Sequence, residues 1–163
     1  MAKGQLSSMD LAISVMVFVF LLVSIISFWN IYVLRFDANL NHKELALKAV
    51  TITDLMVENT GIPTAWNKTT AQVIGLTEKD RRLDSNKLSA LLNMSYSQIK
   101  GYLNIDANEF YFRVVDMNGA LVKAQGQVVE IGNQTANTDF IVKIRRFTLY
   151  GSQKTVLEFL LWQ

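Results

Sequence analysis

The sequence predicts an α+β protein in which one long N-terminal helix precedes a small mixed head. Residues 11–34 contain no charged side chain, and from residue 109 onward apolar and polar residues alternate in short runs. Between these segments, apolar residues recur at helical spacing. The chain has 163 residues, of which 50% are hydrophobic, and this is enough for one domain with one core.

The first apolar segment, residues 11–34, is long enough to cross a membrane as a helix. As a helix its 24 residues span about 36 Å, and a bilayer's hydrocarbon core is about 30 Å thick. Phe28, Trp29 and Tyr32 lie near its C-terminal end, as is typical of residues at a membrane interface. The rest of the chain is too short to bury so apolar a rod on all sides. We therefore predict a single membrane span, slightly favoured to run from inside to outside.

A second helical segment, residues 35–60, follows without an obvious stop. One of its faces is apolar and carries Leu45, Ala49, Ile52 and Met56. Asp37 and Asn39 leave a break near residues 37–39 open, because both side chains compete for backbone hydrogen bonds. Gly61 and Pro63 predict the end of the helix. The apolar repeat is too short for a coiled-coil stalk, so we expect this face to cover a sheet.

The head, residues 61–163, is predicted to begin with short helices and to end in strands. Trp66 and residues 73–76 are apolar enough to pack inside, whereas residues 77–84 form a charged surface stretch. Ser85 is the predicted cap of one short helix carrying Leu88, Leu91 and Leu92. Ser95 is the predicted cap of a second helix, with Gln98 completing a capping box and Ile99, Tyr102 and Leu103 facing inward.

The strand-rich part begins at residue 109, where Phe110, Phe112 and Val114 alternate with more polar positions. Asn118-Gly119 predicts a two-residue hairpin turn, and Gly151-Ser152 a second turn. Further strands are expected over residues 121–123, 128–131, 140–145, 147–150 and 155–162. Short turns between neighbouring strands predict an antiparallel β-meander, with one face buried under the second helical segment.

Composition excludes several functional classes. Lys and Arg number 16 and Asp and Glu 14, so the chain lacks the basic excess of a nucleic-acid-binding protein. There is no cysteine, and the sequence shows no catalytic or metal-binding motif around the single histidine, His42. No nucleotide-binding, zinc-protease or serine-hydrolase motif occurs. We therefore expect no cofactor, no metal and no enzymatic activity, although an enzymatic head is an alternative.

The residues before the apolar segment read Lys3-Gly4-Gln5, followed by Ser7 and Asp10. This order resembles the class III signal peptide of archaeal type IV pilin-like proteins. In that family a prepilin-peptidase-like membrane protease cleaves before the hydrophobic helix, which here implies cleavage between Gly4 and Gln5. The family's acidic residue is usually a glutamate four residues after the glutamine, whereas this chain has an aspartate one position later. No small-residue signal-peptidase site follows the apolar segment, so we expect the helix to remain in the mature protein.

The resemblance implies a type IV pilin-like architecture with four regions. Residues 1–10 are the leader and processing region, and 11–34 the transmembrane and filament-core helix. Residues 35–60 are the amphipathic helix, and 61–163 the head outside the membrane. The implied function is a structural subunit of a surface filament that assembles with other pilin-like subunits. The alternative is a single-span, membrane-anchored binding protein that does not polymerise.

Asp10 has two interpretations. A carboxylate at the start of a membrane helix is favourable if it caps the helix N-terminus in the headgroup layer. In a filament core it needs a cationic partner, and cleavage would create one, the new α-amine at Gln5 of a neighbouring subunit.

Three N-x-S/T sequences, at Asn67, Asn93 and Asn133, are candidate N-glycosylation sites if the head is exported. Asn133 is the strongest candidate because it lies in a polar stretch. Three such sequences are only slightly more than chance predicts for a chain rich in asparagine, serine and threonine.

Overall fold

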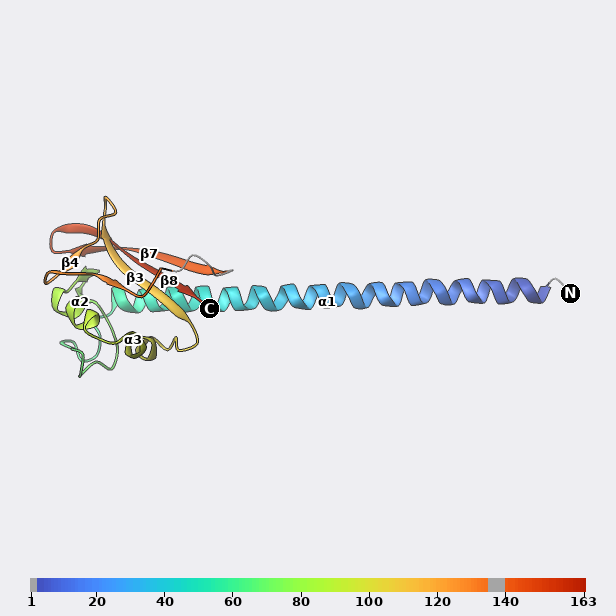
Figure 1. Cartoon of the computed structure of the whole chain (residues 1–163), viewed down its shortest axis with the longest axis horizontal. Helices are drawn as coiled ribbons and strands as arrows, with labels where there is room; N and C mark the ends of the chain where they lie inside the picture. Colours follow the sequence, from blue (N-terminus) through green and yellow to red (C-terminus); the bar gives the residue numbers. More distant parts are fainter. Residues whose placement is uncertain (1–2, 135–139) are drawn as a thin grey trace. The chain divides into compact units, whose positions relative to one another are not determined.

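The computed structural model describes residues 3–134 and 140–163, and their side chains apart from those of residues 3–8, 35 and 37–41 (Figure 1). Two compact units, residues 1–43 and 44–163, are described separately below. Helix α1 (Lys3–Glu58) contributes to both units. The α+β class predicted from the sequence is confirmed, and residues 37–39 are helical.

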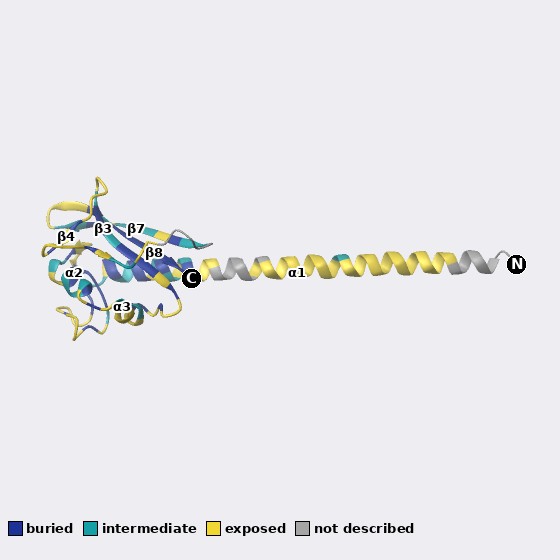
Figure 2. Cartoon of the chain, in the orientation of Figure 1, coloured by how far each residue is buried: buried dark blue, intermediate teal, exposed yellow. Residues whose placement is uncertain are grey.

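In the first unit, α1 is apolar on every side. Within Met9–Leu34, an 18-residue stretch has a mean hydropathy of 2.9 and contributes nothing to a protein core (Figure 2). The Ser24 and Ser27 hydroxyls donate hydrogen bonds, each of 2.8 Å, to carbonyls one turn earlier in the same helix. These two polar groups are therefore satisfied without water, as an apolar environment requires. By length and composition this is the one described helix able to span a membrane.

In the second unit, the last four turns of α1 form part of the head's core. The predicted inward face is confirmed, with Leu45, Ala49, Ile52 and Met56 all buried in the main cluster. On its flank, Asp54 forms an ion pair with Arg146 of the sheet, at 2.5 Å. The helix segment and the sheet thus share one hydrophobic core.

Helix α1 ends at Glu58, within two residues of the predicted stop. Gly61 follows with φ +82°, and a Cβ there would approach the Trp66 ring to 2.4 Å. Any other residue at this position meets both a backbone strain and a steric clash. Trp66 itself is buried and donates from Nε1 to the Gly75 carbonyl at 2.7 Å.

The charged stretch 77–84 forms a hairpin rather than an irregular loop. Strands β1 (Thr77–Lys79) and β2 (Arg82–Leu83) pair antiparallel around Asp80 and Arg81. Both turn residues have positive φ, 47° and 59°, which is typical of a type I′ turn. The sequence did not indicate this turn because it lacks the usual Asn-Gly or Asp-Gly pair.

Two short helices follow, as predicted, but one cap is different. Helix α2 (Ser85–Leu92) is capped by Asp84, not by Ser85, because the Asp84 carboxylate accepts from two α2 backbone N–H groups. Helix α3 (Tyr96–Leu103) has the predicted capping box between Ser95 and Gln98. Its Tyr102 is 38% exposed, so the prediction that Tyr102 faces inward is wrong.

The sheet is mostly antiparallel but it is not a meander. Its order is β1-β2-β7-β8-β3-β6, with β2 and β7 parallel. The strands are β3 (Glu109–Asp116), β6 (Glu130–Ile131), β7 (Ile141–Tyr150) and β8 (Gln153–Trp162), and a separate hairpin pairs β4 (Lys123–Ala124) with β5 (Gln127–Val128). The last strand, β8, lies between β7 and β3 (Figure 1). Its side chains are buried on both faces over most of its length, as is typical of a central strand.

The turn after β3 contains three residues instead of the predicted two. The Asp116 backbone N–H donates to the Ala120 carbonyl at 2.8 Å, and Gly119 adopts φ +86°. The Asp116 carboxylate also accepts from the backbone of Asn118 and Ala120. The Asp116 carboxylate therefore satisfies two backbone N–H groups of the turn, which favours the three-residue loop.

Candidate functional site

The predicted processing and assembly residues lie at the start of α1. Gly4 and Gln5 are helical in backbone, and their side chains lie outside the described residues. Asp10 is exposed and lies about two turns after the first residue of α1, Lys3. The interpretation of Asp10 as the helix cap is therefore wrong, whereas its predicted role in assembly stays a prediction.

The three candidate glycosylation residues are exposed but differ in surroundings. The Asn67 carboxamide oxygen accepts from the backbone and hydroxyl of Thr69, within its own N-x-T sequence. Asn93 caps the C-terminus of α2 and donates from Nδ2 to the Ser89 carbonyl at 2.9 Å. Asn133 is described, but the Thr135 of its sequence lies outside the described residues. The Asn93 side-chain amide is thus engaged in capping α2. The three asparagines belong to three different loops or helix ends.

His42 is exposed in α1. Among the described residues, no group of three or more His, Cys, Asp and Glu side chains is placed to hold a metal ion.

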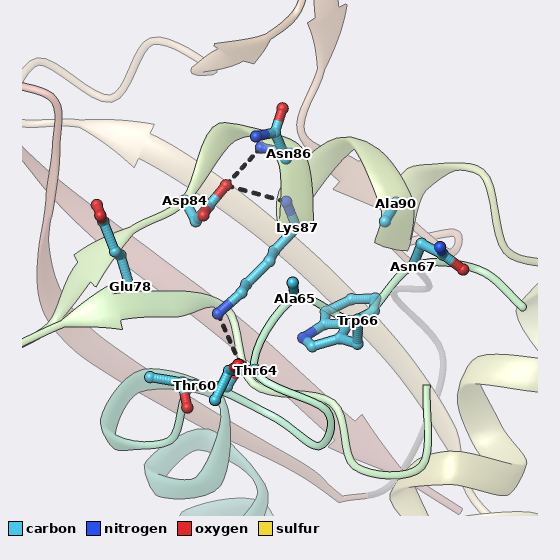
Figure 3. Close-up of a pocket in the computed structure, with 10 residues that line it drawn as sticks. All are labelled: Thr60, Thr64, Ala65, Trp66, Asn67, Glu78, Asp84, Asn86, Lys87 and Ala90. Atoms are coloured by element: carbon cyan, nitrogen blue, oxygen red, sulfur yellow. Dashed lines mark hydrogen bonds between the residues drawn. The ribbon is translucent and has the colours of Figure 1, made fainter. Parts of the chain in front are cut away.

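A pocket of about 490 Å³ lies in the second unit around Lys87 (Figure 3). Helix α2 carries Lys87 inward, so that only 5% of the residue is exposed. Its ammonium donates to the carbonyl of Thr60, just after α1, at 2.7 Å, and to that of Thr77 in β1, at 2.8 Å. The Trp66 side chain also lines the pocket. One buried cation therefore joins the end of α1, strand β1 and helix α2.

The electrostatics of Lys87 reflect this position. Burial lowers the pKa of Lys87 below its ordinary value of 10.5, although the carboxylates of Asp84 and Glu78 raise it in part. Helix C-termini carry partial negative charge and favour a nearby cation, which matches the contact with Thr60. Because its ammonium donates to backbone carbonyls of two other segments, Lys87 has a structural role in the fold.

A second charged cluster lies on the sheet face opposite the main core. The Glu158 side chain of β8 is only 2% exposed, and three cations surround it. Arg113 and Arg145 reach its carboxylate through Nε at 2.7 and 2.6 Å, and Lys143 lies at 3.3 Å. Burial raises the pKa of Glu158, but the hydrogen bonds from these cations outweigh burial, and the net pKa lies below the ordinary value. The cluster therefore carries an excess of positive charge around one buried carboxylate.

A third group joins α3 to the start of β3. The Tyr96 hydroxyl donates to Glu109 at 2.8 Å or to the Phe110 carbonyl at 2.9 Å, and it accepts from the Phe110 N–H. Lys100 forms an ion pair with Glu109 at 2.9 Å. Burial raises the pKa of Tyr96 to about 12, so the phenol keeps its proton at neutral pH. The Tyr96 hydroxyl thus bonds to the backbone N–H and C=O of Phe110, which a neighbouring strand would otherwise pair with.

Sequence reasoning missed Lys87, Glu158 and Tyr96. The one available signal was Glu158, a single acid inside the apolar run of residues 156–162. A lone charge in such a run indicates buried pairing, because an unpaired buried charge is costly.

Comparison of the chain with protein-family models, curated proteins and solved structures finds no match.

Proposed function

We propose that this chain is a structural subunit of a type IV pilus-like surface filament, held in the membrane by α1 until its leader is processed. The observation that carries the proposal is the contrast within α1. Met9–Leu34 is apolar on all sides and contributes to no core, whereas Leu45 to Val57 provide part of the head's core. A helix of this kind offers a long surface for packing against other helices and carries a folded head.

The driving force in such a filament is packing between helices. Lipid tails are as apolar as leucine side chains, so leaving the membrane gains little from the hydrophobic effect itself. Close contact among side chains must favour the helix bundle instead. The Ser24 and Ser27 hydroxyls bond within their own helix, so they add no polar penalty in either environment. The resemblance of Lys3-Gly4-Gln5 to a class III signal peptide supports the same proposal, with a prepilin-peptidase-like protease and other pilin-like subunits as partners.

The experiment combines processing and assembly. The full chain is produced in archaeal cells with a prepilin-peptidase-like protease, and the mature N-terminus is read by mass spectrometry. We expect a chain beginning at Gln5, together with protein in the filament fraction sheared from the cell surface. Gly4→Val is the control, since a bulky residue at the cleavage position should leave an unprocessed, membrane-bound chain.

Two results separate the alternatives. An unprocessed N-terminus with all protein in the membrane contradicts the filament proposal and favours a single-span anchored binding protein. A mature chain that begins beyond Leu34 contradicts both, because the apolar helix would then be absent from the mature protein.

A further inference from the structure

Strand β7 has an open edge along most of its length. On one side it pairs with β8 from end to end. On the other side β2 reaches only Leu149 and Tyr150. Within residues 3–134 and 140–163, no other strand pairs with β7, so its edge is open from Ile141 to Thr148. Open edges of this length are places where another strand can add.

The register identifies which backbone groups face the open edge. A two-residue turn joins Tyr150 to Gln153, so these two residues form a hydrogen-bonded pair, and every second residue of β7 bonds to β8. The residues between them, including Lys143, Arg145 and Phe147, direct their N–H and C=O groups away from β8. The Leu149 N–H, which donates to the Arg81 carbonyl at 3.0 Å, confirms this assignment.

The side chains of the same three residues are exposed on one sheet face. Phe147 is 70% exposed, and the side chains of Arg145 and Lys143 are 63% and 41% exposed. The two cations share the carboxylate of Glu158 with Arg113. Glu130, directly across from Arg113 in β6, accepts a hydrogen bond from the Tyr111 hydroxyl, so three cations stand beside two carboxylates and a positive excess remains. Arg145 binds Glu158 through Nε, which leaves its terminal amino groups directed to solvent. A hollow of about 310 Å³ lies between this cluster and Phe147.

We propose that the β7 edge binds an extended acidic segment of another polypeptide by strand addition. The added strand pairs with the backbone of Lys143, Arg145 and Phe147. Its alternate side chains then lie on the cationic face, with acidic groups beside Lys143 and Arg145 and an apolar group beside Phe147. Carboxylates bind arginine well because the guanidinium donates several parallel N–H groups. The proposal goes beyond filament assembly, since it concerns what the head binds.

Charge disfavours the simplest other occupant, the same edge of a second copy. Two β7 edges brought together would place Lys143 and Arg145 of each copy against those of the other. Like charges on facing strands are unfavourable, and charged edge strands commonly prevent self-pairing in this way. The same charges favour an acidic partner strand.

The test uses the full chain in detergent micelles and a short, blocked, fluorescent peptide. Glutamate alternates with threonine in the peptide, with a leucine at each end of the glutamate face. This alternation presents the acidic face in either strand direction. We expect saturable binding by fluorescence polarisation that weakens with added salt, and a matched peptide with lysine for glutamate should not bind.

Hydrogen exchange locates the contact. The amides of Lys143, Arg145 and Phe147 should exchange quickly in the free protein and become protected with the peptide. Lys143→Pro should weaken binding by at least about tenfold. This substitution removes the backbone N–H of residue 143, which faces the open edge, and leaves the hydrogen bonds between β7 and β8 in place. Phe147→Thr should also weaken binding, whereas Lys68→Glu, a charge reversal in the exposed loop before β1, should change it far less.

Three outcomes overturn the proposal. The first is no binding of the acidic peptide to the wild-type chain. The second is binding that leaves the three β7 amides unprotected. The third is protection of these amides without peptide, in step with a concentration-dependent oligomer, which would assign the edge to a second copy. None of these outcomes depends on whether the chain forms filaments.

Discussion

Lys87→Met removes the ammonium that ties three segments of the head together and keeps most of the side-chain volume. In the wild type, the ammonium satisfies the carbonyls of Thr60 and Thr77. Thr77 is 1% exposed, so water cannot readily replace the lysine there. The variant therefore leaves one buried acceptor without this donor and exposes the other to partial hydration.

The expected loss follows from these two contacts. A buried acceptor that loses its partner costs about 1–3 kcal/mol, and the partly exposed Thr60 carbonyl adds less. Methionine also removes the cost of desolvating an ammonium, which offsets part of the loss. We expect Lys87→Met to lower the free energy of unfolding by about 2 kcal/mol. For a head of this size, this corresponds to a drop in Tm of roughly 6–10 °C.

The loss should depend on pH. Burial lowers the pKa of Lys87 in the folded state below 10.5. Between the two pKa values the unfolded chain binds more protons than the folded chain, so the wild type gains stability as pH rises through this window. Methionine does not titrate. The difference between wild type and variant should therefore be smallest below the lowered pKa and grow as pH approaches 10.5.

The assay is urea unfolding of the full chain in detergent micelles, followed by near-ultraviolet circular dichroism, which reports the packed aromatic side chains of the head. Lys79→Met is the matched control, because Lys79 lies in β1 and is exposed. We expect the control to stay within about 0.5 kcal/mol of wild type. Equal stability of the two variants would refute the structural role assigned to Lys87, whereas a difference that shrinks as pH rises would contradict the lowered pKa of Lys87 in the folded state.

Three further predictions concern other parts of the chain. A chain truncated at Gly61 should aggregate or unfold at lower temperature than one truncated at Arg35, because only the first loses the buried face of α1; equal melting temperatures would contradict this. Glu109→Gln should make the head less sensitive to acid. Hydrogen bonds from Lys100 and a tyrosine lower the pKa of Glu109 in the folded protein. The stability that Glu109 contributes is therefore present above its pKa in the unfolded chain and is lost as pH falls through its pKa in the folded protein. The effect, read from melting temperatures between pH 3 and 7, should stay below about 1 kcal/mol because Glu109 is half exposed. Asp10→Asn should leave cleavage and membrane insertion intact but lower the ratio of sheared filament to membrane-bound protein; an unchanged ratio would exclude the proposed pairing in assembly.

Local patterns predicted the helices well because the information lies within a few residues. The spacing of Leu45 and Met56 reports one face of one helix, and that face is buried as expected. The capping box of Ser95 and Gln98 is likewise a contact between near neighbours. The error at Asp84 has the same local origin, since aspartate and serine are nearly equal as caps and stand side by side.

The strand order and the charged clusters depend on pairing between distant residues, which a single sequence does not encode visibly. The meander prediction assumed that neighbours in sequence pair in space. Instead β8 pairs with β3 from Glu109 to Asp116 and with β7 on its other side. The partners of Glu158 become evident only once that register is known, because Arg113 and Arg145 lie directly across from it on the two flanking strands.

The two uses of α1 impose different constraints on the chain. Under the proposed function, Met9–Leu34 exchanges lipid for another apolar helix, and no side chain in it belongs to the head's core. The turns from Leu45 to Val57 have no such freedom, since their removal opens the core of the head. A proteolytic cut between Leu34 and Leu45 would therefore free a head that keeps its core, whereas a cut after Leu45 would separate the head from part of it. Within α1, a cut in the short segment between these two regions would therefore separate the apolar helix from the head and leave the head's core intact.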